Sequence, residues 1–116
     1  MAADEDAIVL CVLDYFEGWF EADPERMRRA PHPDLAKRSL RREGLHQVTA
    51  SQMIDATAAG EGRKLDSPAR HIDVRVVEVY GDIATAMVDS NVYREYVHLV
   101  RTEGDWKIVN ALWAWT

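Results

Sequence analysis

Apolar residues near the start of the chain recur with the spacing of an α-helix. Between Asp4 and Glu21 one apolar row repeats every four residues, and a second row lies one position further round the helix. The two rows consist of Ile8, Val12, Phe16 and Phe20, and of Cys11, Tyr15 and Trp19. Because residues three and four apart share one face of a helix, this pattern predicts a helix with a wide buried stripe.

Two shorter helices follow in the pattern. Asp23 is a favourable N-cap residue and a proline comes directly after it, which predicts a helix over residues 24–30. The prolines after residue 30 end that helix, since each disfavours helical geometry in the residue before it. Thr49 and Gln52 form a capping-box pattern, so a third helix is expected to begin there.

The rest of the chain alternates between apolar and polar residues, which is typical of β-strands. Turn-forming residues at 81–82 and 102–105 separate these segments. The predicted strands cover residues 35–42, 71–80, 83–101 with a bend near 89–91, and 106–116. Helices followed by an antiparallel meander predict an α+β fold, in which residues 1–116 form a single domain.

Three tryptophans lie on the last predicted strand. Strict alternation puts Trp113 and Trp115 on one face and Trp106 on the other. A strongly curved sheet around the first helix would form a cone-shaped cavity with an aromatic wall. The alternative is a filled core in which the indole rings only pack.

Composition and charge narrow the classes of function. The chain has 116 residues, of which 47% are hydrophobic and 29% charged, and its net charge is −6. Seven of the fourteen basic residues fall between Arg26 and Arg42, which leaves open a patch for an acidic partner. We favour a solvated helix face and a charged strand there, because the acidic balance opposes phosphate-backbone binding. We therefore expect no nucleic-acid partner. We expect no membrane partner either, since no apolar run approaches the ~20 residues that a membrane-spanning helix needs.

Cys11 is the only cysteine, so no internal disulfide can form. The first residues are acidic and do not have the pattern of a secretory signal. Both observations predict a cytoplasmic location.

Two segments resemble a known superfamily. Residues 14–27 with His32-Pro-Asp34 resemble the opening of nuclear transport factor two-like proteins, where a helix ends in a small residue and Asp before a short helix and a strand. Glu95-Tyr96, Leu99-Val100 and Gly104-Asp-Trp-Lys-Ile-Val-Asn110 resemble the closing hairpin of the putative lumazine-binding branch. The resemblance implies a cone-shaped fold, with N-terminal helices packed in a strongly curved, mostly antiparallel sheet.

This superfamily includes ketosteroid isomerase, which uses a carboxylate base with a tyrosine and a protonated Asp as oxyanion donors. By resemblance, Tyr15 matches that tyrosine, although a core tyrosine with a satisfied hydroxyl is the alternative. The position of the base falls near Ser39 or Leu40, where there is no carboxylate, and His98 takes the place of the second donor. The isomerase reaction itself is therefore not expected.

The resemblance places Asp89, Asn91 and His98 on the cavity face with Trp113 and Trp115. Asp89 beside His98 would be an acid/base pair, with Tyr15 as the hydrogen-bond donor. The alternative is a buried polar pair that only fixes the sheet. The full expected ligand-binding set is Tyr15, Trp19, Met87, Asp89, Asn91, His98, Trp113 and Trp115.

We interpret the chain as a small-molecule-binding domain for a flat apolar or aromatic ligand. The alternatives are an enzyme of the isomerase, dehydratase or cyclase type, and a non-catalytic dimerisation module. The four histidines lack the short spacing of metal ligands, so neither a metal nor a cofactor is expected. The resemblance also implies a homodimer formed through the outer face of the sheet.

Overall fold

The computed structural model describes residues 2–116, and its helices and strands confirm the α+β fold. The helices are α1 (Ala2–Phe20), α2 (Pro24–Arg29), α3 (Ala50–Ala58) and the short 3-10 helix η1 (Arg63–Leu65). The strands are β1 (Pro31–Arg41), β2 (Gly44–Val48), β3 (Ile72–Tyr80), β4 (Ile83–Ser90), β5 (Tyr93–Thr102) and β6 (Asp105–Trp115). None of these helices is long and apolar enough to cross a bilayer.

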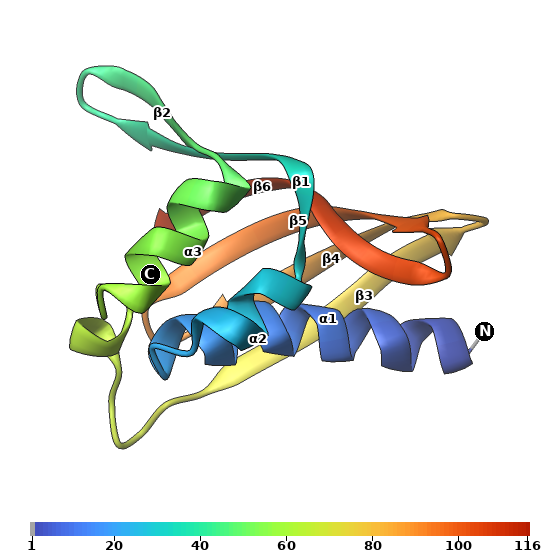
Figure 1. The fold of residues 1–116 in the computed structure, drawn as a ribbon, viewed down its shortest axis with the longest axis horizontal. Helices are drawn as coiled ribbons and strands as arrows, with labels where there is room; N and C mark the ends of the chain where they lie inside the picture. Colours follow the sequence, from blue (N-terminus) through green and yellow to red (C-terminus); the bar gives the residue numbers. More distant parts are fainter. Residues whose placement is uncertain (1) are drawn as a thin grey trace.

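The six strands form one sheet in the order β2-β1-β6-β5-β4-β3. Every neighbouring pair is antiparallel except β1 and β6, which are parallel. The β1–β2 hairpin extends beyond the rest of the molecule (Figure 1). Strands β3, β4, β5 and β6 form the predicted meander, which makes up most of the sheet. Strand β1 joins the meander alongside β6.

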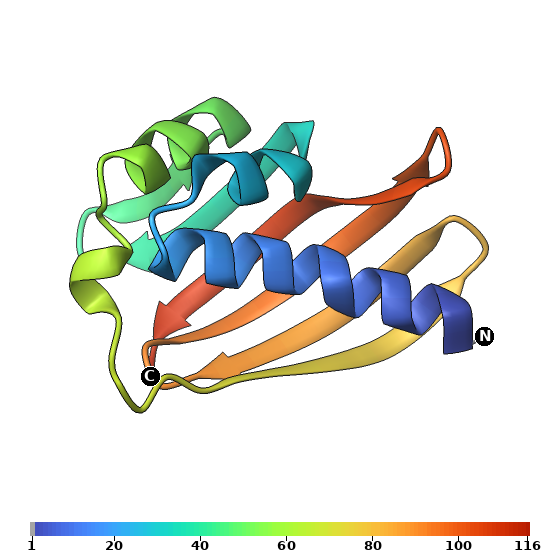
Figure 2. The same cartoon turned by 60° about the horizontal axis from the view of Figure 1, so that its bottom comes forward.

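Helix α1 lies across the concave face of the sheet (Figure 2). Its apolar stripe is buried as the 3.6-residue period predicts: Ile8, Val12, Tyr15, Phe16 and Phe20 are each at most 2% exposed. Inward-facing residues of β4, β5 and β6 complete this core. Residues that face inward from the sheet near Tyr15 consequently lie in the same buried, mostly apolar core.

The sequence pattern predicted one bent strand over residues 83–101. This prediction is wrong, because the segment is not a single strand. It forms β4 and β5, which pair as an antiparallel hairpin. The hydroxyl of Ser90 accepts the backbone N–H groups of Val92 (3.2 Å) and Tyr93 (2.9 Å) across the reversal. This side-chain hydrogen bonding replaces ladder bonds in the turn, and the alternation of apolar residues does not reveal it.

Strict alternation along the last strand was also a wrong expectation. Opposite β5, Leu99 pairs with Ile108 but His98 pairs with Asn110, so Val109 is an extra residue in β6. A bulge of this kind reverses the face on which the following side chains lie. Trp106 consequently lies on the same face as Trp113 and Trp115, not on the opposite one.

Two further differences concern β1 and its neighbour. Strand β1 begins at Pro31, four residues before the predicted start. Its pairing with β6 is irregular between Pro31 and Ala36, and a strand can contain prolines where its pairing is irregular. Strand β2 was not predicted at all. Its side chains are mostly exposed, so it lacks an apolar alternation.

Candidate functional site

A polar cluster lies inside the aromatic core between α1 and the sheet. Tyr15 extends from α1, Lys37 from β1 and Glu95 from β5. The Tyr15 hydroxyl donates a hydrogen bond to Glu95 Oε2 at 2.9 Å, and Lys37 Nζ donates to the Tyr15 hydroxyl oxygen. Lys37 Nζ is also 3.7 Å from Glu95 Oε2. Three elements distant in sequence thus form one proton-sharing chain.

Burial distinguishes this cluster from a surface ion pair. The side chain of Glu95 is 1% exposed and that of Lys37 11% exposed. Burial lowers the pKa of Lys37, although the Glu95 carboxylate opposes that shift. Burial and the adjacent Glu95 carboxylate raise the pKa of Tyr15 well above its ordinary value. Tyr15 therefore stays protonated as a donor, and the Lys37 ammonium group gives up its proton more readily than that of an exposed lysine.

Aromatic rings surround the ammonium group. Lys37 Nζ lies 4.7 Å from the centroid of the Tyr15 ring, 6.0 Å from that of Trp19 and 5.7 Å from that of Trp113. Trp19 Nε1 donates to the Tyr93 hydroxyl at 3.0 Å. Rings at these distances attract a cation and exclude water, so the cluster has an aromatic wall.

Trp115 extends this wall towards solvent. Its ring centroid is 5.2 Å from that of Tyr93 and 5.1 Å from that of Trp113, yet the residue is 62% exposed. The wall is therefore continuous from the buried cluster to the surface.

Ser39 adds a hydroxyl to the same face of β1. It lies two residues after Lys37, pairs with Trp113 on β6, and is 4% exposed. Its Oγ is buried without a hydrogen-bond partner among the residues that the structure describes. Buried hydroxyl groups normally have a partner, so this one is available to another group in the site.

The predicted set of site residues is divided between the two faces of the sheet. Tyr15, Trp19, Trp113 and Trp115 lie on the concave side, as expected. Met87, Asp89 and His98 lie on the outer face, since buried residues alternate with them along β4 and β5. Asn91 is exposed in the β4–β5 turn and accepts the backbone N–H of His71 at 3.2 Å. The expectation that Asp89, Asn91 and His98 face the cavity is therefore wrong.

Asp89 and His98 also do not form a pair. His98 lies opposite Thr85 on β4, and Asp89 lies four residues further along that strand, which is a separation of ~13 Å. Asp89 contacts Arg94 instead, at 3.4 Å. Neither histidine nor aspartate can orient the other at this separation.

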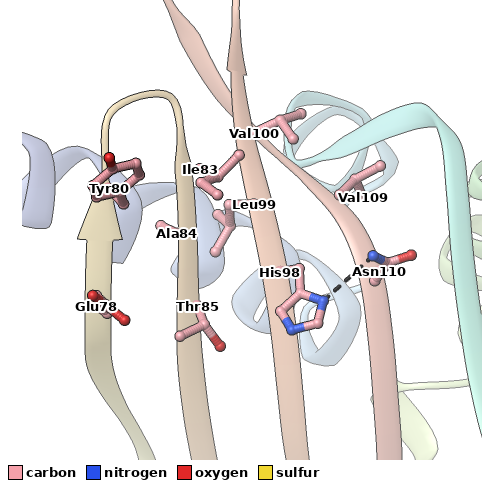
Figure 3. Close-up of a pocket in the computed structure, with 10 residues that line it drawn as sticks. All are labelled: Glu78, Tyr80, Ile83, Ala84, Thr85, His98, Leu99, Val100, Val109 and Asn110. Atoms are coloured by element: carbon pink, nitrogen blue, oxygen red, sulfur yellow. Dashed lines mark hydrogen bonds between the residues drawn. The ribbon is translucent and has the colours of Figure 1, made fainter.

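His98 lines a shallow depression of about 380 Å³ on the outer face of β3–β6 (Figure 3). The side-chain amide of Asn110 lies 3.4 Å from its Nδ1. The depression is open, and Tyr80, Ile83 and Val100 make much of its lining apolar. It is separated from the buried cluster by the thickness of the sheet.

Sequence reasoning missed Glu95 and Lys37. Each was visible as a charged residue on the inward-facing side of its strand. On β5 this side carries Tyr93, Glu95, Val97 and Leu99, and on β1 it carries Leu35, Lys37 and Ser39. A charge in the apolar register of a strand indicates a buried ion pair or a site. No group of metal-ligating side chains occurs within residues 2–116.

Comparisons with known proteins identify the family and the fold. A family model described as putative lumazine-binding matches residues 3–114. No sequence among the curated proteins matches the chain.

Solved structures share the fold at low sequence identity. An NTF2-like protein of unknown function from Silicibacter pomeroyi is 15% identical, with a TM-score of 0.78 over 99% of this chain and 98% of the other. An NTF2-like protein of unknown function from Methylobacillus flagellatus is 20% identical, with a TM-score of 0.75 over 100% and 94%. A hexachlorocyclohexane dehydrochlorinase, LinA-type3 from Novosphingobium barchaimii, is 14% identical, with a TM-score of 0.73 over 99% and 88%.

Proposed function

Since the chain belongs to the putative lumazine-binding family of nuclear transport factor two-like proteins, we propose that it binds a flat aromatic molecule on the concave face of its sheet. The binding site comprises the Tyr15–Lys37–Glu95 cluster and the aromatic wall of Trp19, Tyr93, Trp113 and Trp115. The buried cluster is the observation that carries the proposal.

A buried ion pair needs an explanation because it seldom stabilises a fold. Removing two charges from water costs several kcal/mol per ion, and apolar side chains of similar size often serve a core as well. Perturbed charged groups beneath an aromatic surface are typical of ligand-binding and active sites. The unpartnered hydroxyl of Ser39 supports the same interpretation, since a ligand's polar edge would complete its hydrogen bonding.

The test is a titration with lumazine and other flat aromatic compounds, in which tryptophan emission is measured after each addition. Saturable quenching at micromolar concentration is expected. Trp113→Phe should reduce the quenching amplitude, whereas Trp106→Phe should retain it, because Trp106 lies against Arg101, away from the cluster. Absence of saturable quenching by every compound would contradict the proposal.

The outer face provides the matched controls for affinity. His98→Ala and Asp89→Ala should leave the dissociation constant unchanged, since both side chains lie on the other side of the sheet. Glu95→Gln should weaken binding of ligands with a polar edge. If the outer-face variants alone reduced affinity, the ligand would occupy the depression around His98 instead.

An enzymatic function is the second candidate, and the hydrogen-bonded chain Lys37–Tyr15–Glu95 favours it. In this function Lys37 moves a proton at a carbon next to a carbonyl group, while the unpartnered hydroxyl of Ser39 donates to the carbonyl oxygen. The test is exchange of hydrogen for deuterium in a flat ketone, measured by NMR. Lys37→Met should abolish the exchange and His98→Ala should preserve it; equal loss in both variants would contradict this role.

A homodimer through the outer sheet face remains a further proposal, and a non-catalytic dimerisation module would use the same surface. Tyr96 and Leu112 are paired across β5 and β6 on this face, and each is 50% exposed. Leu112→Asp should shift the sedimentation coefficient to that of a monomer, whereas Leu65→Asp on η1 should not. A monomeric parent protein would contradict the proposal.

A cytoplasmic location is also proposed, because Cys11 is the only cysteine and is partly buried in α1. Fractionation of cells that express the chain tests this directly. Recovery outside the cytoplasmic fraction would contradict it.

A further inference from the structure

Lys37 differs from the other two lysines of the chain in its surroundings. Lys64 is exposed on η1, and Lys107 donates to the backbone carbonyl of Arg29 near the surface. Lys37 alone lies among three aromatic rings, with its Nζ against the Tyr15 hydroxyl. An amine held this way is fixed in position and shielded from most of the solvent.

A lysine amine that is shielded from water can act as a nucleophile, because burial favours its uncharged form. Burial lowers the pKa of Lys37, so a larger share of this side chain carries a free electron pair at neutral pH than in an exposed lysine. Enzymes that form imines with carbonyl compounds activate lysine through desolvation in the same way. The side chain of Lys37 is 11% exposed, so it is not fully sealed from solvent.

We propose that Lys37 forms an imine with the carbonyl carbon of a flat aromatic aldehyde or ketone bound against Trp19 and Trp113. This inference rests on the proposed binding function and names the class of ligand. The attacking nitrogen forms a C–N bond, and the electron pair of the carbonyl π bond moves to oxygen. The C–O bond then breaks and oxygen leaves as water, so that lysine ammonium and carbonyl compound give a protonated imine and water.

Tyr15 and Glu95 provide the proton path for this step. The proton that leaves the ammonium group passes to the Tyr15 oxygen, while Tyr15 passes its own proton to Glu95 Oε2. After the attack the nitrogen gives a second proton to the negatively charged oxygen, which becomes a hydroxyl group. Glu95 then returns the first proton through Tyr15 to this hydroxyl group, which leaves as water, so no proton is gained or lost overall. Both hydrogen bonds already have the required direction, Lys37 to Tyr15 to Glu95.

Ser39 supplies a second polar contact. Its buried hydroxyl lies on the same face of β1 as Lys37 and next to Trp113. Because it has no partner within the described part of the chain, it can donate to the carbonyl oxygen as negative charge develops there. The site thus has a nucleophile, a proton path and an oxygen-binding group around one position.

The test is reductive trapping. The protein is incubated with 2-naphthaldehyde and sodium cyanoborohydride at neutral pH, and adducts are located by peptide mass spectrometry. Adduct at Lys37 is expected to exceed that at Lys64 or Lys107 about tenfold. The peptide with Met1 is scored separately, since α-amino groups also react with aldehydes.

Variants separate chemistry from folding. Lys37→Arg retains a cation beside the aromatic rings. It should form no adduct at position 37, and its circular dichroism spectrum should match that of the parent protein. Tyr15→Phe retains the ring and the Glu95 carboxylate but breaks the proton path, so it should slow trapping at Lys37 about tenfold without altering the reaction at Lys64. His98→Ala should match the parent protein.

The corresponding alcohol, 2-naphthalenemethanol, distinguishes the two proposals because it can bind but cannot form an imine. Quenching of tryptophan emission by the alcohol, together with equal trapping at all three lysines, would overturn the imine and leave the binding function standing. Quenching by neither compound, with no preference for Lys37, would overturn both.

Discussion

Lys37 and Glu95 stabilise each other only as a pair. Each is buried, and each would be an isolated charge in an aromatic core if its partner were removed. Leaving one buried charge unpaired is strongly unfavourable, whereas replacing both partners often costs little. The pair is therefore a weak source of stability and a sensitive position for substitution.

Glu95→Gln is expected to lower the free energy of unfolding by about 3 kcal/mol, because Lys37 loses its counter-charge. Urea denaturation followed by circular dichroism measures this change. The double variant Lys37→Met, Glu95→Gln should be more stable than Glu95→Gln alone by about 1 kcal/mol or more.

The exposed Glu43, in the β1–β2 turn, supplies the control. Glu43→Gln should change the free energy of unfolding by less than about 0.5 kcal/mol. A loss in Glu95→Gln no larger than in Glu43→Gln would mean that the pair does not exist in solution.

Among the secondary-structure elements, β6 has the feature with the widest effect. The single extra residue Val109 decides which side chains of the following segment enter the core. Ala111 is 5% exposed and Trp113 lies over Lys37 only because the bulge reverses the alternation. The aromatic wall therefore depends on one backbone irregularity.

Deletion of Val109 should remove the bulge and leave Ala111 and Trp113 on the inner face, because the remaining residues then alternate strictly along β6. We expect the free energy of unfolding to change by less than about 1 kcal/mol. Tryptophan emission should match that of the parent protein, because Trp113 keeps its place in the register with β5.

Val109→Ala is the matched control, since it shortens the side chain and keeps the number of residues. It should cost less than about 1 kcal/mol, because Val109 is only partly buried. A shift of tryptophan emission to longer wavelength in the deletion variant would contradict the assignment of Val109 as the extra residue.

The segment before η1 closes against α1 through a glycine. A Cβ atom at Gly62 would lie 2.4 Å from the carbonyl oxygen of Trp19 and 2.5 Å from its ring. The carbonyl belongs to helix backbone and cannot move aside, so only glycine allows this approach.

Gly62→Ala is expected to cost about 2 kcal/mol in unfolding free energy and to change the emission of Trp19. Gly60→Ala has open space around its Cβ but a φ of +78°, so it should cost about 1 kcal/mol through backbone strain alone. Its tryptophan emission should match the parent protein. Identical spectra for both variants would contradict the contact.

The elements that the sequence predicted well are those set by local chemistry. The capping box of Thr49 and Gln52 is present at the start of α3, and Asp23 accepts the backbone N–H of Arg26 at the start of α2. These signals lie within four residues of one another, so they act in any context.

What the sequence did not predict depends on contacts between distant strands. The bulge at Val109 is defined by the register with β5, and the reversal at Ser90 by a side chain that bonds its own turn. The expected face of His98 was wrong because resemblance, not register, assigned it. Glu95 was overlooked although it lies on the same face of β5 as Val97 and Leu99, which are at most 1% exposed.

Across the whole molecule, groups that stay protonated in the folded state make stability depend on alkaline pH. Burial raises the pKa of Cys11 from 9.0 to about 12, and of Tyr93 from 10.0 to about 12. Above pH 9 the unfolded chain binds fewer protons than the folded one, so the free energy of unfolding falls as pH rises. Lys37 acts in the opposite direction, since its lowered pKa makes the folded state release its proton first.

Comparison of the parent protein with Cys11→Ala isolates the thiol, because the other groups are common to both. Between pH 9 and 10 the stability of the parent should fall more steeply, by up to about 1.4 kcal/mol per pH unit. Urea midpoints at pH 8, 9 and 10 measure the difference. Parallel pH profiles would mean that Cys11 is accessible to solvent in the folded state.

The parallel pairing of β1 with β6 has a consequence for the synthesis of the chain. Ser39 and its neighbour Trp113 are separated by most of the sequence, and contacts of such range are slow to form. During translation, α1 and β1 leave the ribosome long before β6, with Tyr15 and Lys37 still uncovered. A nascent chain therefore exposes its apolar helix face and a bare strand edge until the last strand arrives, and in that interval it is a substrate for chaperones.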